Sequence, residues 1–505
     1  MRTHKTARPR TEQPKRPMAA VGRRAVAGAR ASMTAETGIG VAAFFAVNVL
    51  LAFAFRRLPG LAALHAGVVI AIGLGASIHR NDKILAAYVC AYIVGAEVLW
   101  RMVSAPLFWE FGKYAMVVVM GASILRSHRW DRRSRLRVLY IVCLLPSTLV
   151  YYEFGSTLAI LKERLSFNLS GPLAIATAVL FFGRLNLNRA QTARLFVYSI
   201  GPILGIVALA ASSMMRGEIQ FLNASNFVAS GGFGPNQVSA AMGLGVTLSF
   251  LYLCVARPSM AVKTLIVAGL AVCAIQSALT FSRTGLYLVA GSVAIAASYL
   301  WRIRELRGIL SGLFLTGAAA AVFLVVPLLQ QVTGGAAEAR WTNTAGTGRE
   351  ELFFDDLAIW RKNWAIGVGP GNVPSSREDL SGTMVHTELS RLLAEHGMFG
   401  VGALLALGTV ALANLRRRRD ALTRGLAAAF IGWSFLYMSV SAMRTVAPAF
   451  VFGLASSGMA FVVPRGRSVL ASRLPEEATL GPRAATRVRP VKVVPRIVPP
   501  PQSAF

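Results

Sequence analysis

Two arginines and one histidine stand in settings that suit the binding of a phosphate and the removal of a proton. Arg283 lies in the stretch TFSRTG, residues 280–285, between two apolar runs. Arg349 follows the stretch NTAGTG, and His386 precedes the stretch TELSRLLAEH. Arginine binds phosphate well because its planar fork is permanently charged. A neutral histidine can take a proton from an attacking hydroxyl.

A helix start is expected to position Arg349. Thr347 and Glu350 have the spacing of a capping box, so a helix should begin near Gly348. Arg349 then lies in the first turn, where free N–H groups and the helix dipole favour anions. The apolar stripe that follows suits a helix at the membrane interface or one that packs on the protein's own helices. Its members are Leu352, Phe353, Leu357, Trp360 and Trp364.

A second helix is expected to position His386. Thr383 is a candidate N-cap and Gly397 a candidate C-terminal stop. His386 would then lie in the first turn, where the helix dipole disfavours its charged form. The alternative for His386 is a solvated surface residue, and for Arg283 a solvated helix end.

Other charged residues have the spacing of structural pairs. Glu388, Arg391 and Glu395 are expected to pair on the surface of a helix, and His396 suits a helix C-terminus as a cation. Asp355 and Asp356 are neighbours and do not face each other. Two pairs inside apolar stretches are either self-neutralised or functional. They are Glu97 with Arg101 and Glu110 with Lys113.

The rest of the chain is dominated by apolar runs. Its 505 residues are 55% hydrophobic and only 15% charged, and many runs reach the roughly 18 residues that cross a bilayer. We expect an all-α polytopic membrane protein with about 12–14 transmembrane helices. The predicted spans are 37–55, 59–78, 84–101, 107–125, 138–154, 171–183, 195–213, 238–256, 264–281, 285–301, 309–328, 398–414, 425–442 and 447–463.

The basic residues gather in loops and tails between these runs. The positive-inside rule of membrane proteins therefore explains the net charge of +31, and a nucleic-acid partner is not expected. Both termini are expected in the cytoplasm. Residues 1–33 and 465–505 should be disordered basic tails around a membrane domain, 34–464. The long hydrophilic segment 329–397 is expected to be an extracytoplasmic loop on the same side as loop 214–237.

No metal or cofactor motif is present in the sequence. The stretch GVGPGN, residues 367–372, lies outside any βαβ unit, so it predicts a shaped turn and not a dinucleotide site. No metal and no cofactor are expected. A lipid-linked pyrophosphoryl sugar fits the remaining constellation, with its pyrophosphate on the arginines and its polyprenyl tail between helices. The arginines would stabilise the leaving group.

The ordered motifs resemble a known superfamily. GGFGPNQ, LTFSRTG, RWTNTAGTGRE, GVGPGN and HTELSRLLAEHGMFG, within roughly residues 225–405, are similar to those of the O-antigen ligase and polymerase superfamily of bacterial envelope glycosyltransferases. The first half of the chain resembles it only in topology. The resemblance implies an inverting, metal-independent glycosyltransferase with a GT-C-like helical fold in the bacterial inner membrane. Its donor would be a glycan on undecaprenyl pyrophosphate.

The resemblance also assigns roles to residues. It implies that Arg283 and Arg349 hold the pyrophosphate and that His386 is the base. Thr387 stands where the family commonly has Asn, which puts the immediate partner of His386 in doubt. Residues expected to shape the substrate site are Asn236, which matches the Pro-Asn of the first motif, Arg340, Gly369 and Asn372.

Several functions stay open at this point. A polymerase of exopolysaccharide or O-antigen is slightly favoured over a ligase that transfers the glycan to lipid A core or another acceptor. A transporter of envelope precursors is the alternative of a different class, although it favours internal repeats and short loops. A non-catalytic scaffold would not need the three site residues to converge. Expected partners are the lipid-linked glycan, membrane lipids, a glycan or lipid acceptor and other polysaccharide assembly proteins.

Overall fold

The computed structural model describes most of the chain between residues 18 and 461. The described ranges are 18–126, 132–150, 158–216, 221, 224–342, 348–377 and 386–461. They lie within one compact unit, Met1–Phe461. Of the two predicted tails, residues 1–17 and 465–505 lie outside the described residues. Residues 18–33 belong to the first helix, which begins inside the region that we expected to be a disordered tail.

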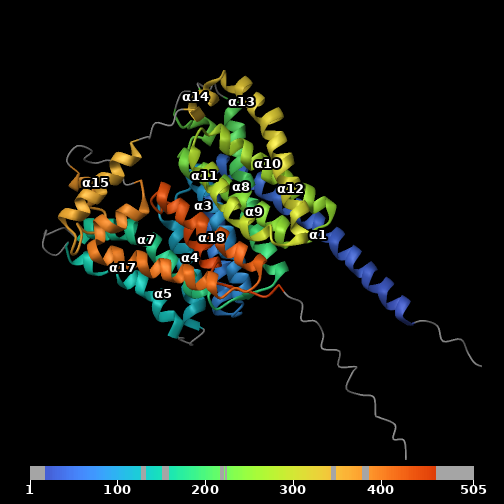
Figure 1. Ribbon diagram of the computed structural model, residues 1–505, viewed down its shortest axis with the longest axis horizontal. Coiled ribbons are helices and arrows are strands. Elements are labelled where there is room, and N and C mark those ends of the chain that lie inside the picture. The colour runs from blue at the N-terminus through green and yellow to red at the C-terminus, as the bar shows by residue number, and fades with distance from the viewer. Residues whose placement is uncertain are drawn as a thin grey trace, which may run out of the picture. The chain divides into compact units, whose positions relative to one another are not determined.

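The described residues are mainly helical (Figure 1). The first half contains α1 (Met18–Arg57), α2 (Pro59–Ile78), α3 (Lys83–Met102), α4 (Phe111–Arg126), α5 (Arg132–Val142), η1 (Pro146–Leu149), α7 (Leu158–Phe182), α8 (Arg189–Met214), η2 (Val228–Ser230) and α9 (Pro235–Val255). The second half contains α10 (Met260–Leu279), α11 (Arg283–Leu300), α12 (Arg304–Ala320), η3 (Ala321–Val325), α13 (Val326–Thr333), α14 (Ala336–Thr342), α15 (Arg349–Lys362), α16 (Val373–Ser376), α17 (Glu388–Arg416), α18 (Ala421–Val440) and α19 (Ala447–Leu454).

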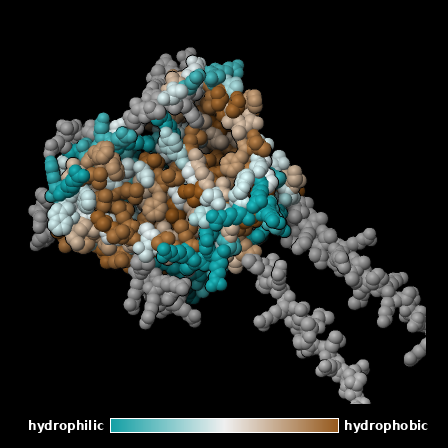
Figure 2. Space-filling view, in the orientation of Figure 1, coloured by the Kyte–Doolittle hydropathy of each residue, from teal (hydrophilic) through white to brown (hydrophobic). Residues whose placement is uncertain are grey.

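Ten helical segments in the described part of the chain are long and apolar enough to cross a membrane. They confirm an all-α polytopic membrane protein. On the face shown in Figure 2, hydrophobic residues occupy the middle and hydrophilic residues gather above and below them. The ten segments are Gly38–Arg57, Pro59–Ile78, Lys83–Met102, Lys162–Phe182, Arg189–Met214, Pro235–Val255, Met260–Leu279, Arg304–Thr333, Glu388–Arg416 and Ala421–Val440.

Four of the fourteen predicted spans are not among these ten segments. The prediction for 285–301 corresponds to α11, which has 18 residues. The prediction for 107–125 corresponds to α4, which has 16 residues. The prediction for 138–154 is wrong as one helix, because α5 ends before Pro146 begins the short η1. The prediction for 447–463 is also wrong, since α19 has only eight residues. After it, β2 (Gly458–Met459) pairs in parallel with β1 (Asn186–Leu187). The backbone there therefore bonds to another segment of the chain and does not continue the helix.

Helix α9 lies at the centre of the unit, where its whole apolar window is buried. It packs against α8, α10 and α11, while α3 packs against α8 and α11 against α18. Glycines allow the closest approaches, as in other membrane helix pairs. A β-carbon on Gly285 would lie 2.2 Å from the Ser239 carbonyl oxygen, and one on Gly95 would lie 2.3 Å from the Ser199 carbonyl oxygen. The α9–α11 contact thus sits beside Arg283.

We predict that Gly285→Ala lowers the stability of the protein. Alanine favours helices by about 0.5–1 kcal/mol over glycine, but its methyl group would collide with backbone, and overpacking costs about 1–3 kcal/mol. The matched control is Gly312→Ala, because a β-carbon there has no neighbour within 4 Å. Thermal unfolding in detergent should show a lower midpoint for Gly285→Ala only. Equal midpoints for the two variants would contradict the close α9–α11 contact.

Candidate functional site

Arg101, near the end of α3, joins three helix ends. Its Nη1 donates to Gln237 Oε1 (2.9 Å) and to the Arg444 carbonyl oxygen (2.7 Å). Its Nη2 donates to Glu97 Oε1 (2.7 Å) and to the Trp109 carbonyl oxygen (2.8 Å). The end of α3, the first turn of α9 and the segment after α18 therefore meet on one side of the helical unit.

Both ion pairs predicted inside apolar stretches form. Glu97 pairs with Arg101, and their side chains are only 1% and 8% exposed, respectively. Glu110 pairs with Lys113, and Ser170 Oγ lies 3.0 Å from Glu110 Oε2 and 3.3 Å from Lys113 Nζ. Because buried charges must be paired, these residues act as fixed links between helices.

The segment that carries Arg444 is held on both sides by buried carboxylates. The Val446 N–H donates to Glu97 Oε2 (2.7 Å), and the Met443 N–H donates to Glu388 Oε2 (3.0 Å). With the Arg101 bond to its carbonyl, the backbone at Arg444 is fixed. Sequence reasoning missed Arg444, although it shows the signal that singled out Arg283, an arginine between two apolar runs.

His386 is half-buried, and the positive charges of three arginines act on it. Burial lowers its pKa to about 4, helped by the positive charges of Arg444, Arg349 and Arg377. The ring is therefore neutral at neutral pH, as predicted, but the reason is different. Helix α17 begins at Glu388, so His386 precedes its first turn and the predicted placement within that turn is wrong.

Asp356 ties α15 to the beginning of α17. Its Oδ1 accepts from Arg377 Nη2 (2.6 Å), and its Oδ2 accepts from Ser390 Oγ (2.6 Å). Burial raises the pKa of Asp356, while these two hydrogen bonds oppose the rise. Ser390 also bonds Thr387, the N-cap residue of α17. Asp356 is buried whereas Asp355 is half-buried, so the two neighbours do point apart.

Arg349 is the first residue of α15, which confirms the predicted helix start. Gly348 occupies the N-cap position with a φ of 71°, a left-handed conformation that favours glycine. The predicted N-caps are wrong, because Gly348 and not Thr347 caps α15, and Thr387 and not Thr383 caps α17. Arg340 belongs to α14, and its side chain lies outside the described part.

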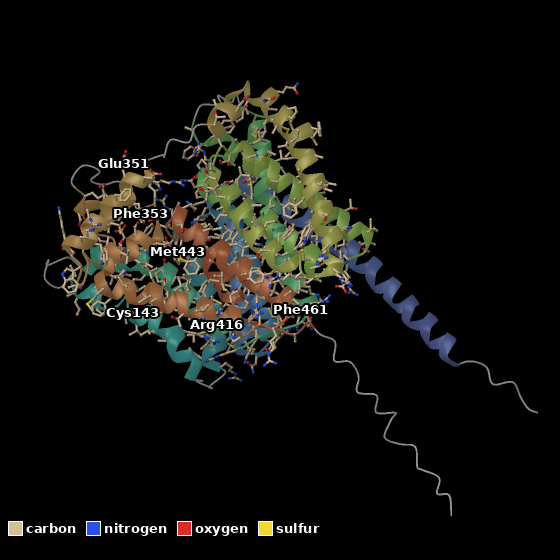
Figure 3. The ribbon with its side chains drawn as sticks, viewed as in Figure 1. Cys143, Glu351, Phe353, Arg416, Met443 and Phe461 are labelled. Atoms are coloured by element: carbon tan, nitrogen blue, oxygen red, sulfur yellow. The ribbon has the colours of Figure 1, made fainter. Side chains whose placement is uncertain are left out.

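The apolar stripe of α15 faces two environments. Leu352 is 5% exposed and packs inward, whereas Trp364, just after the helix, is 62% exposed. Figure 3 labels Glu351 and Phe353 on this helix, and both are exposed. One side of α15 therefore packs on the protein's own helices while its outer residues are left for another environment.

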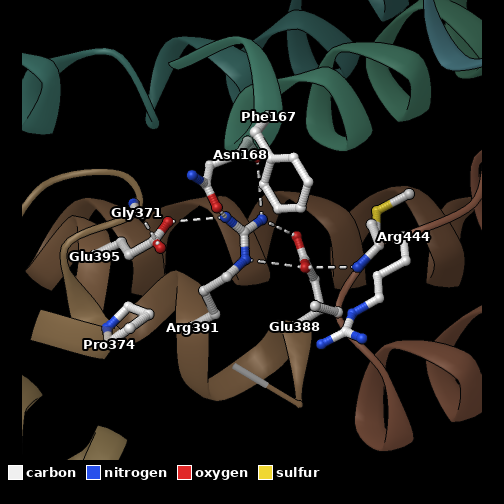
Figure 4. A pocket seen from close by; sticks show the side chains of 10 residues that line it. Phe167, Asn168, Gly371, Pro374, Glu388, Arg391, Glu395 and Arg444 are labelled. Atoms are coloured by element: carbon white, nitrogen blue, oxygen red, sulfur yellow. Dashed lines mark hydrogen bonds and ion pairs between the residues drawn. The ribbon is translucent and has the colours of Figure 1, made fainter. Parts of the chain in front are cut away.

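Glu388, Arg391 and Glu395 form a buried ion-pair cluster and not the surface pairs that we expected (Figure 4). Arg391 contacts Glu388 Oε1 at 2.5 Å and Glu395 Oε2 at 2.8 Å. It also donates to the side-chain and backbone oxygens of Asn168 on α7, both at 3.1 Å. These residues and Arg444 line a cavity of about 90 Å³. Spacing predicted the pairs, but it carries no information about the helix that covers them.

The GVGPGN turn docks on α17. The Gly369 N–H donates to the Glu395 carbonyl oxygen (3.0 Å), and the Gly371 N–H donates to Glu395 Oε1 (2.8 Å). Asn372 Oδ1 accepts from Arg164, and Asn372 Nδ2 donates to the Val368 carbonyl. The turn is shaped as predicted. Gly369 bonds it to α17, while Asn372 bonds both within the turn and to Arg164 on α7. Contact of its backbone with a ligand stays a prediction.

Gly397 ends the first part of α17, as predicted. Its φ of 56° and ψ of −133° are non-helical and kink the chain there. The structure disfavours the C-terminal cation that we expected of His396, because the side chain is completely buried and its Nδ1 bonds to Ser147 Oγ. A charged imidazole would be costly at such a place, and its one acidic contact, Glu395 Oε2 at 3.9 Å, is already paired with Arg391.

Asn236 and Arg283 lie at the α9–α11 corner. Ser282 Oγ donates to Asn236 Oδ1 (2.8 Å), and Ser282 is the N-cap of the helix that Arg283 begins. Gln237, the neighbour of Asn236, accepts from Arg101. Arg101 in turn bonds the Arg444 carbonyl. A hydrogen-bonded path thus links this corner to the arginines around His386, while convergence of Arg283 itself on His386 stays a prediction.

Comparison with models of known protein families and with curated proteins finds no match to this chain. The resemblance to the O-antigen ligase and polymerase superfamily therefore rests on the ordered motifs alone. Among the described residues, no group of three or more His, Cys, Asp or Glu side chains has an arrangement that could hold a metal ion.

We predict that Arg391→Met destabilises the protein by about 3–5 kcal/mol, because it leaves two carboxylates buried without their cation. Arg349→Met is the matched control, since Arg349 is half-buried at a helix start. Thermal unfolding should show a large loss for Arg391→Met and a much smaller one for Arg349→Met. Equal losses would mean that the cluster on α17 is not a stabilising core.

Proposed function

We propose that this chain is a membrane glycosyltransferase that uses a glycan carried on undecaprenyl pyrophosphate. It would polymerise or ligate a surface polysaccharide, exopolysaccharide or O-antigen, at the outer face of a bacterial inner membrane. The observation that carries the proposal is the neutral His386 beside Arg444, Arg349 and Arg377. A proton acceptor among fixed positive charges is what transfer from a pyrophosphate donor needs.

In this proposal, an acceptor hydroxyl attacks the anomeric carbon of the donor sugar from the side opposite the pyrophosphate. The new bond forms as the bond from carbon to the pyrophosphate oxygen breaks, which inverts the configuration. The hydroxyl proton passes to His386. The electron pair of the broken bond leaves with undecaprenyl pyrophosphate, whose charge Arg349 and Arg444 stabilise, together with Arg283.

The arginines also tune the base. Without donor, their charges help to hold the His386 pKa at about 4, where imidazole is a weak base. A bound pyrophosphate offsets those charges and so favours the protonated ring. The base would therefore gain strength when the donor arrives. This coupling gives Arg444 a role beyond simple attraction.

The distribution of basic residues supports an extracytoplasmic placement of the site. The arginine-rich stretch RIRELR includes the first turn of α12, and LRRRRDALTR runs from the end of α17 into the first turn of α18. The second stretch therefore lies at the end of α18 opposite to Arg444. By the positive-inside rule, Arg444, Arg101 and His386 would then face outward. A GT-C-like arrangement is part of the same proposal.

We predict that His386→Ala lowers transfer by about 10²–10⁴-fold, the usual contribution of a general base. Arg349→Gln should also lower it strongly, while His79→Ala, an exposed histidine, should not. The assay uses purified protein in detergent with the undecaprenyl-pyrophosphate glycan and a chelator. Lengthening of the lipid-linked glycan would indicate a polymerase, and transfer to another acceptor a ligase. Full activity of His386→Ala would refute the mechanism.

We predict that Arg444→Gln moves the acid limb of the kcat/KM profile toward higher pH. Activity needs neutral His386, so it falls as pH drops through the pKa of the free protein, about 4. Removing the Arg444 charge lets that pKa rise toward 6.5. Arg257→Gln, at an exposed loop position, is the matched control and should leave the limb in place. An unchanged limb in Arg444→Gln would contradict the coupling.

A further inference from the structure

A second cavity, of about 290 Å³, opens beside Arg101. It lies between the end of α3, the loop that leads to α4 and the loop that precedes α9. We call it the aromatic pocket. The lining residues used below are Glu97, Trp100, Arg101, Phe108, Trp109 and Phe233.

The rings of the aromatic pocket are open to a ligand and yet held in place. Trp109 is 46% exposed and Phe108 is 59% exposed. The Trp109 ring lies 6.0 Å from the Phe233 ring, centroid to centroid, and 4.7 Å from the Arg101 guanidinium carbon. Phe233 belongs to the GGFGPNQ motif, so the proposed transferase contributes one of its own motif residues to the pocket.

The backbone beside these rings is strained. Ser104 lines the pocket with a φ of 51°, a left-handed conformation that residues other than glycine rarely adopt. The Ser104 N–H bonds the Arg101 carbonyl (3.0 Å), and the Ala105 N–H bonds the Trp100 carbonyl (3.0 Å). Such strain persists where the surroundings fix it, and it is common at binding sites.

We propose that the aromatic pocket binds a sugar ring of the glycan that the protein transfers. A pyranose has an apolar face of C–H groups, which packs on an aromatic ring, and a rim of hydroxyls. The rim of hydroxyls suits the polar part of the pocket wall, where the exposed Ser104 side chain lies beside the buried ion pair of Glu97 and Arg101. A hydrocarbon chain would gain contact with the rings but no hydrogen bond from Ser104.

The placement of the pocket fits this ligand. Arg101 lines the pocket, and the same guanidinium bonds the carbonyl of Arg444 at 2.7 Å. Arg444 in turn is the largest charge acting on His386. If the pyrophosphate of the glycan contacts the arginines, the sugars of the glycan would therefore lie near this pocket. The inference rests on the proposed function, which it extends from the pyrophosphate to the sugars.

The test measures binding without turnover. The full-length His386→Ala protein in nanodiscs is titrated with a fluorescently labelled oligosaccharide, released by mild acid from the lipid-linked glycan of the source cells, and anisotropy reports binding. Trp109→Ala should weaken binding about tenfold, while Trp109→Phe should stay within about threefold because it keeps a ring face. Trp364→Ala removes another exposed tryptophan and should change nothing.

The outcomes separate this inference from the proposed function. Equal affinities for Trp109→Ala and Trp364→Ala would overturn the sugar site, even if the protein without substitutions transfers glycan. Binding that is lost only in Trp109→Ala would support the site, even if no transfer is seen. If a decyl chain displaced the labelled oligosaccharide and the unlabelled oligosaccharide did not, the sugar site would also be overturned. The aromatic pocket would then bind a hydrocarbon. Unchanged unfolding midpoints establish that each variant is folded.

Discussion

The ion pair between Glu97 and Arg101 is the interaction on which the candidate site depends. The two residues are one helical turn apart on α3, and together they bond to the first turn of α9, to the loop before α4 and to the backbone at Arg444 and Val446. A charged pair in an apolar helix is costly unless its hydrogen bonds are satisfied. Here those bonds are used to position three helix ends that are remote in sequence.

The second constraint is electrostatic. Several arginines are collected near one imidazole, and the buried acids on α15 and α17 are already committed to Arg377 and Arg391. Burial lowers the pKa of His386 most, and the positive charge around the ring lowers it further, so the ring stays neutral. Such an arrangement is poorly suited to a cation and well suited to an anion whose arrival strengthens the base. In the proposed function, donor binding would be linked to proton acceptance through these charges.

The sequence predicted the helical membrane class, the start of α15 at Arg349 and the break at Gly397, because these depend on composition and local spacing. It also predicted the pairs of Glu97 with Arg101 and of Arg391 with its two glutamates. It did not predict that the Arg391 cluster is buried or that Arg444 lies beside His386, since both result from contacts between distant segments. The prediction of a membrane span at 447–463 failed for the same reason, because β2 pairs with residues that lie far upstream.

The most direct test of the account is to locate the pyrophosphate. A cryo-electron microscopy structure of the protein in nanodiscs, with undecaprenyl pyrophosphate bound, would show the diphosphate relative to the arginines. The account predicts density for it in contact with Arg349 and Arg444 and next to His386. A diphosphate that lies away from all three residues, at another helix end or on the opposite membrane face, would contradict the proposed function and the role assigned to His386.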